Sequence, residues 1–297
     1  SGLSAGRCQT PALRLIYENQ KTIDSSPGRK VYNTTGYFTQ KKLPFVLNYN
    51  YDSEDKVVDF LEQSVNHDHI YTCSKPRNTT KTQPIPYTTS GLQQAASNEL
   101  RISPKDTMKC CQKLYEGGYI TYMRTDSTTY SEVFLEKADL FIQETYGSTY
   151  VREDLNTLSE GNKVTKTTKK NKSKKATTGD SEVSAQEAHE AIRPTDITLL
   201  EPDDVESRDL KVYKLIRRNT LESCMAPATY LGVTAALTAP QEHEYRYSTE
   251  QVVFPGWKIV AGYEEQSADY TYLLTLKNNT VLNYKSVTAK VTLKDLK

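Results

Sequence analysis

Several features that define large protein classes are missing from this sequence of 297 residues. No apolar run approaches the roughly 20 residues that a membrane-spanning helix requires, so we expect no membrane segment. The five cysteines include no Cys-x-x-Cys pair, and their odd number favours reduced thiols in an intracellular compartment. The chain begins at Ser1, with neither an initiator Met nor the apolar core of a signal peptide. We therefore expect a piece cut from a longer intracellular protein.

The chain also lacks a broad excess of basic charge, because its net charge is only +1 at pH 7. Residues 163–175 contain seven lysines and no acidic residue, so the rest of the chain is net acidic. A protein that binds nucleic acid mainly by neutralising phosphates usually shows a wide basic surface. Any such binding must therefore depend on a few placed residues. The lysines fall within a low-complexity stretch, residues 159–180, which we predict to be a flexible, solvated insertion.

Metal ligands at short spacing are scarce, since the chain has only four histidines. His67 and His69 could form half of a site, but no third ligand lies nearby in the sequence. We interpret this pair as an exposed helix end, and we predict that the chain binds no metal.

Periodicity predicts an α+β fold in which β-rich segments flank a mainly helical middle. Strand-like stretches occupy residues 30–39 and 43–51, and a strand-like pattern fills residues 229–297 with a turn at Asn278 and Asn279. An extended, hairpin-like segment at 119–124 follows two helices, which resembles a winged helix by analogy of fold. Helical spacing is expected in residues 5–20, 55–65, 88–100, 104–116, 132–145 and 210–222.

Two segments concentrate polar and ionisable residues beside Gly or Pro: 116–127 (EGGYITYMRTDS) and 185–196 (AQEAHEAIRPTD). Tyr122 is a candidate nucleophile for a phosphodiester, because an aryl phosphoester conserves the energy of the broken bond. Free tyrosine has a pKa of about 10, so a tyrosine nucleophile needs positive charge nearby. Arg124 would project to the same side of an extended segment and could hold phosphate oxygens. His189 could bind the same phosphate or relay a proton.

Spacing alone leaves other interpretations open. The chain has 21 tyrosines, and most tyrosines are partly buried aromatic residues with a solvated hydroxyl. His189 could equally be a surface histidine, and Arg193 before Pro194 suits a structural ion pair. These residues indicate a phosphate site without establishing one.

Four motifs, in order and covering nearly the whole chain, resemble those of the type IA DNA topoisomerases. Residues 118–127 (GYITYMRTDS) are similar to the active-site signature of that family, and residues 185–196 to its second signature. Residues 4–13 (SAGRCQTPAL) and 86–97 (PYTTSGLQQAAS) supply the other two.

The resemblance implies that Tyr122 attacks one DNA strand and becomes linked to its 5′ phosphate, releasing a 3′ hydroxyl. Because the linkage stores the bond energy, strand passage, relaxation of negative supercoils and resealing would need no ATP. The resemblance also implies that Arg124 and His189 position the scissile phosphate. The residues expected to contact single-stranded DNA or to support the active-site loop are Arg7, Gln9, Thr125, Asp126, Ser127 and Arg193.

The resemblance further implies Mg²⁺, held by an Asp-x-Asp-x-Glu cluster in an N-terminal Toprim domain that this sequence lacks. The acidic run at 201–204 (EPDD) has neither that spacing nor a strand context. We therefore expect the remainder of the parent polypeptide to supply Mg²⁺, and the isolated chain to be inactive or weak.

Three parts follow from the resemblance. Residues 1–25 would be a helix of an incomplete DNA-groove domain, and residues 26–81 with 229–297 a β-rich arch domain. Residues 82–228 would form an inserted, mainly helical, winged-helix-like domain carrying the catalytic tyrosine. Two other readings stay open: a non-catalytic winged-helix DNA-binding module in which Tyr122 is structural, and a scaffolding fragment whose arch binds protein partners.

Overall fold

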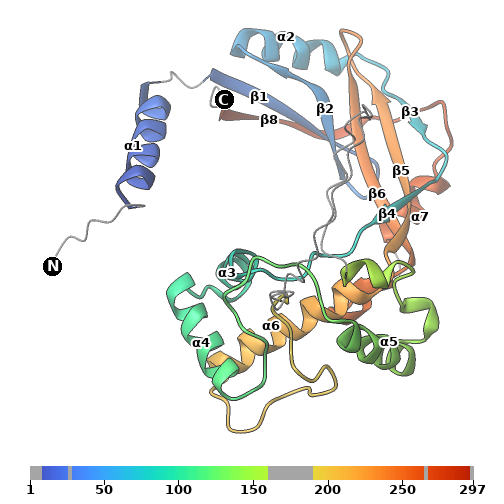
Figure 1. The fold of residues 1–297 in the computed structure, drawn as a ribbon. Helices are drawn as coiled ribbons and strands as arrows, with labels where there is room; N and C mark the ends of the chain where they lie inside the picture. Colours follow the sequence, from blue (N-terminus) through green and yellow to red (C-terminus); the bar gives the residue numbers. More distant parts are fainter. Residues whose placement is uncertain (1–8, 26–28, 160–189, 264–266, 295–297) are drawn as a thin grey trace, which may run out of the picture. The chain divides into compact units, whose positions relative to one another are not determined.

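The chain forms two compact units, shown in Figure 1. The β-rich unit comprises residues 1–77, 231–251 and 266–297, and the helical unit comprises residues 78–230 and 252–265. The α+β class predicted from the sequence is confirmed. The computed structural model describes residues 9–25, 29–159, 190–263 and 267–294.

Within the described residues, eight strands form one sheet in the order β7-β3-β5-β6-β2-β1-β8, with β4 paired to β5. Strands β1 and β2 are antiparallel, as are β1 and β8. The strands are β1 (Arg29–Phe38), β2 (Leu43–Tyr51), β3 (Ile70–Cys73), β4 (Arg77–Lys81), β5 (Ala228–Thr238), β6 (Glu244–Phe254), β7 (Thr280–Val281) and β8 (Tyr284–Lys294).

The β-rich unit also contains helices α1 (Gln9–Ser25), α2 (Glu54–Val65) and α7 (Ala268–Thr275). The helical unit contains α3 (Thr89–Ala95), a π-helical turn (Ala96–Leu100), α4 (Pro104–Glu116), α5 (Glu132–Tyr146), α6 (Ser207–Cys224) and three 3-10 turns (Ser148–Tyr150, Leu155–Leu158 and Gly256–Val260).

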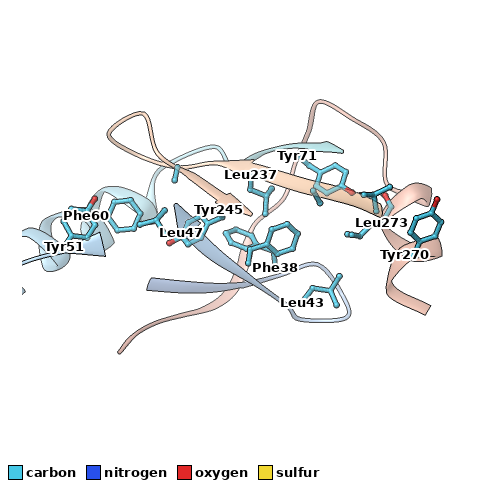
Figure 2. Close-up of a cluster of buried hydrophobic side chains, with 14 of the residues drawn as sticks. Phe38, Leu43, Leu47, Tyr51, Phe60, Tyr71, Leu237, Tyr245, Tyr270 and Leu273 are labelled. Carbon is cyan, nitrogen blue, oxygen red and sulfur yellow. Dashed lines mark hydrogen bonds between the residues drawn. The ribbon is translucent and has the colours of Figure 1, made fainter. Parts of the chain in front are cut away.

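The core of the β-rich unit forms on one face of alternating strands. In β2, Leu43, Phe45 and Leu47 are buried while the residues between them are exposed, the period expected of a strand with one covered face. The Phe38 ring meets the Phe45 ring edge-on at a centroid distance of 5.6 Å. The Phe38 ring also lies 5.2 Å from the Tyr245 ring, and Figure 2 shows these two side chains next to each other. This cluster extends to buried residues of α2 and α7.

Two expectations for the β-rich unit are wrong. The strand-like pattern at residues 270–276 falls largely in helix α7, because the Ser267 hydroxyl caps its first turn by accepting a hydrogen bond from Tyr270 N at 3.2 Å. Tyr270 and Leu273, three residues apart, then face the core together. His69 is buried rather than exposed, and its Nδ1 lies 2.7 Å from the Thr238 carbonyl oxygen.

Helix α6 connects two cores of the helical unit. Its residues Val212 and Ile216 pack in a cluster with α3 and α4, whereas Leu221 and Cys224 pack in a second cluster with α5. One long helix therefore holds together the parts that carry the sequence motifs.

The chain returns to the helical unit after β6. The strand-like pattern expected to run through residue 260 stops at Phe254, because Pro255 and Gly256 begin a 3-10 turn. Gly256 has φ +50°, and a Cβ at this position would lie 2.4 Å from the Pro227 carbonyl oxygen. Trp257 N donates to the Ala226 carbonyl oxygen at 2.9 Å, which fastens this segment beyond the end of α6.

Candidate active site

The segment around Tyr122 is held along one side by the described part of the second signature. Thr121 N donates to the Arg193 carbonyl oxygen at 2.9 Å, and Arg193 N donates to the Thr121 hydroxyl at 3.0 Å. Thr195 N donates to the Tyr119 carbonyl oxygen at 3.0 Å. The fold therefore brings together two motifs that lie far apart in the sequence, since the bonded residues Arg193 and Thr121 are 72 positions apart.

Thr89, from a third motif, holds the other side of the segment. Its backbone N donates to the Thr125 carbonyl oxygen at 2.9 Å, and its hydroxyl lies 2.7 Å from the Met123 carbonyl oxygen. Thr125 N donates back to the Thr89 hydroxyl at 3.0 Å. Thr88, the preceding residue, caps α3 by accepting from Gly91 N at 3.2 Å. The start of α3 thus fixes the chain on both sides of Arg124.

Burial alternates along this segment. Met123 and Thr125 are buried, whereas Tyr122, Arg124 and Asp126 are exposed, as in an extended chain with one covered side. The side chains of Tyr122 and Arg124 therefore project to the same side.

Tyr122 is 42% exposed, about as much as its neighbour Tyr115 at 41%, whereas some other tyrosines of the helical unit are buried. Tyr130 and Tyr213 are buried, and burial raises the pKa of Tyr213 to about 12 and that of Tyr130 further. The Tyr122 ring meets the Tyr115 ring edge-on at a centroid distance of 5.2 Å, a contact that orients the ring.

An open polar hollow of about 650 Å³ lies beside the segment. Within the described part of the chain, Arg124 makes no hydrogen bond or ion pair, so its guanidinium is available to an anion. The lining residues are Thr88, Thr89, Ser90, Gln93, Arg124, Thr125 and Asp126.

Thr125 and Ser127 shape the loop. Ser127 N donates to the Thr125 hydroxyl at 3.0 Å, and the Ser127 hydroxyl lies 2.8 Å from that of Thr129. These contacts suit a supporting role, whereas the exposed Asp126 lines the hollow.

Arg193 is already engaged within the protein. Its guanidinium pairs with Glu190 at 2.5 Å, lies 4.1 Å from the centre of the Phe134 ring, and donates to the Pro194 carbonyl oxygen at 3.0 Å. Glu190 also accepts a hydrogen bond from Ser131 N at 3.1 Å, where α5 begins. These contacts favour the structural ion pair over DNA contact for Arg193. Sequence reasoning missed Glu190, although its spacing of three residues from Arg193 was a usable signal.

The remaining predicted site residues lie elsewhere. His189 and Arg7 fall outside the described residues, as does the lysine-rich insertion at 159–180 apart from Ser159. Gln9 is the first residue of α1, in the β-rich unit.

Across the described residues, no group of three His, Cys, Asp or Glu side chains could hold a metal ion. The described residues therefore provide no set of ligands for the Mg²⁺ that the resemblance implies. No helix in the part of the chain that the structure describes is both long and apolar enough to cross a membrane.

Comparison with known proteins decides the family. The family profile described as DNA topoisomerase matches residues 1–294. The chain belongs to the type IA DNA topoisomerases. DNA topoisomerase 1 of Haemophilus influenzae is 33% identical over 274 residues, which cover 87% of this chain and 29% of that protein. The Escherichia coli DNA topoisomerase 1 is 32% identical, with the same shares covered.

A relative from a virus matches nearly the whole chain. The prokaryotic-type DNA topoisomerase 1 of Acanthamoeba polyphaga mimivirus is 30% identical and covers 99% of this chain and 36% of its own length. The full-length topoisomerase I structure from Thermotoga maritima shares the fold, with a TM-score of 0.70 and 24% identity, over 100% of this chain and 46% of its own. The chain thus spans less than half of these topoisomerases.

Proposed function

We propose that Tyr122 is the nucleophile of a type IA topoisomerase and forms a transient phosphotyrosine link to one DNA strand. The observation that carries the proposal is the pairing of an exposed Tyr122 with a solvent-accessible Arg124 on a segment held from both sides. Because the backbone that carries both residues is held, the nucleophile and the cation start close to where a phosphate would need them.

The proposed reaction exchanges one ester for another. The Tyr122 oxygen bonds to the phosphorus and its proton leaves to solvent or a base. The bond from phosphorus to the 3′ oxygen breaks, and that oxygen takes up a proton to give a 3′ hydroxyl. Arg124 stabilises the negative charge on the non-bridging oxygens. Attack by the 3′ hydroxyl reverses the exchange, so strand passage and relaxation of negative supercoils proceed without ATP.

The two units have distinct proposed roles. The helical unit is the gate that carries Tyr122, and the β-rich unit from β1 onward is the arch that moves it. Helix α1 is part of an incomplete DNA-groove domain. Single-stranded DNA within a negatively supercoiled duplex is the substrate, and the rest of the parent polypeptide is the partner that completes the site. We expect residues 1–297 alone to cleave DNA weakly or not at all, with Mg²⁺ entering through that partner. An intracellular location also stays a prediction, with which the four free cysteines described agree.

The test uses the full-length parent protein. It is incubated with Mg²⁺ and single-stranded DNA, the reaction is stopped with denaturant, and any adduct is mapped by peptide mass spectrometry. Tyr122→Phe should abolish the adduct, while Tyr115→Phe, which alters the neighbouring ring, should retain it. DNA binding without an adduct on any tyrosine would reject the nucleophile and favour a non-catalytic DNA-binding module.

A further inference from the structure

A second pocket of about 800 Å³ opens in the helical unit. We call it the Trp257 pocket, after the residue that lines it together with Tyr87, Arg218, Asn219 and Glu222. It shares Thr88 and Ser90 with the hollow beside Arg124, so the two cavities adjoin. The proposed strand cleavage gives no role to Arg218, Asn219, Glu222 or Trp257.

The pocket offers flat aromatic surface. The Trp257 indole N–H donates to the Lys81 carbonyl oxygen at 3.1 Å, which fixes the orientation of a ring that lines the pocket. Tyr87 is half-buried and sits among Pro84, Ile85 and Pro86. Fixed aromatic rings beside apolar side chains are the usual surface on which an unpaired base stacks.

The polar end of the pocket has unsatisfied acceptor capacity. Asn219 is 3% exposed, its Nδ2 donates to the Ile85 carbonyl oxygen at 3.2 Å, and its Oδ1 has no hydrogen-bond partner among the described residues. Glu222 is also buried, and burial raises the pKa of its carboxyl to about 7. A buried carboxyl with a shifted pKa, beside an unpaired amide oxygen in a pocket, marks a candidate binding site.

Arg218 does not make this an anion site. Its Nη2 lies 2.6 Å from Glu99 Oε2, and its Nε lies 3.7 Å from Glu222 Oε1. The two carboxyls offset the guanidinium charge, and Arg218 Nε is a buried donor with no hydrogen-bond partner among the described residues. The polar end therefore offers a ligand this donor as well as the Asn219 Oδ1 acceptor. Lys258, whose Nζ lies 5.5 Å from the centre of the Trp257 ring, supplies positive charge outside that cluster.

We propose that the Trp257 pocket receives one unpaired base of the DNA strand, with the exocyclic amino group of adenine or cytosine donated to Asn219 and Glu222. Amide and carboxylate oxygens are the side-chain acceptors that suit these amino groups. Lys258 then lies near the backbone phosphate of the same nucleotide. The inference rests on the proposed DNA substrate. It adds that one base of the bound strand contacts the protein in the pocket next to the Arg124 hollow.

Trp257 is the only tryptophan in the 297 residues, so its fluorescence reports on the pocket directly. The chain is titrated with a short single-stranded oligonucleotide of mixed sequence and with an abasic phosphodiester of the same length. Anisotropy of labelled copies measures binding independently. We expect both to bind but only the oligonucleotide to quench Trp257. Binding of both without a difference in quenching would overturn the base pocket alone, whereas binding of neither would overturn the DNA proposal too.

Variants separate the pocket from the nucleophile. Tyr87→Ala should weaken oligonucleotide binding about tenfold, the loss typical of one stacking ring, and leave the abasic affinity unchanged. Tyr263→Ala, an exposed tyrosine of the same unit outside the pocket, should change neither. Tyr122→Phe should keep the quenching, because the pocket does not need the nucleophile. If Tyr87→Ala weakened binding of the oligonucleotide and of the abasic ligand equally, the proposal would be refuted. It would also be refuted if free adenosine or cytidine quenched Trp257 saturably while the oligonucleotide did not.

Discussion

The Thr89 hydroxyl should control the stability of the segment that carries Tyr122. Thr89→Val keeps the size and branching of the side chain but removes the hydroxyl. The Met123 carbonyl then loses a donor at 2.7 Å, and Thr125 N loses an acceptor at 3.0 Å. Both residues are buried, and each buried group left without a partner costs about 1–3 kcal/mol. The expected total is about 2–4 kcal/mol, because the Thr89 N to Thr125 O bond remains.

In a domain of about 150–250 residues, 1 kcal/mol lowers the melting temperature by roughly 2–4 °C. Thr89→Val should therefore lower the midpoint of the helical unit by about 5–15 °C in thermal melts followed by circular dichroism. Thr89→Ser is the matched control, since it keeps the hydroxyl, and should shift the midpoint by only about a third as much. Equal midpoints for the two variants would refute the assigned hydrogen bonds.

The same change should slow adduct formation at Tyr122 in the full-length protein. A misplacement of about 1 Å at a reacting group costs about a hundredfold in rate, so even a small shift of this segment should be measurable below the melting transition. Thr89→Ser should restore the rate, and a Thr89→Val protein with an unchanged rate would show that Tyr122 does not depend on this clamp.

Three further changes test the structure elsewhere. Burial raises the pKa of Glu222 to about 7, so the folded state loses stability as the pH rises from about 4.5 through 7. Glu222→Gln should remove up to about 3 kcal/mol of that loss, measured as the difference between the free energies of unfolding in urea at pH 5 and pH 8. Burial lowers the pKa of His69, so stability should fall as the pH drops below about 6.5, and His69→Gln should flatten that dependence. Gly256→Ala, whose Cβ would lie 2.4 Å from Pro227 O, should cost at least about 2 kcal/mol, more than Gly262→Ala at φ +86° in open space.

Local signals predicted much of the fold because several elements carry their own boundaries. Helix α4 begins at Pro104 behind the capping residue Ser103, both visible in the sequence. Helix α7 was missed because its aromatic and β-branched residues suit a strand, and only the packing of Tyr270 and Leu273 against the core decides otherwise.

The candidate site was only partly readable from the sequence. The motifs identified Tyr122 and Arg124, and the extended spacing placed them on one side. The ion pair of Arg193 with Glu190 spans three residues, but the contact of Arg193 with the Phe134 ring joins distant parts of the chain, and no local pattern shows it. Glu222 is notable only for its burial, and burial arises from tertiary packing.

The return of the chain to the helical unit at residues 252–265 affects how the protein can be dissected genetically. The helical unit is not a contiguous cassette, because Gly256 and Trp257 come from a segment encoded beyond β5 and β6. A clone of residues 78–230 would omit the backbone that hydrogen-bonds Ala226 and the indole that lines the second pocket. Domain exchange between relatives must therefore transplant both stretches, and co-expression of the short piece with the long one would serve as a fragment-complementation assay for this unit.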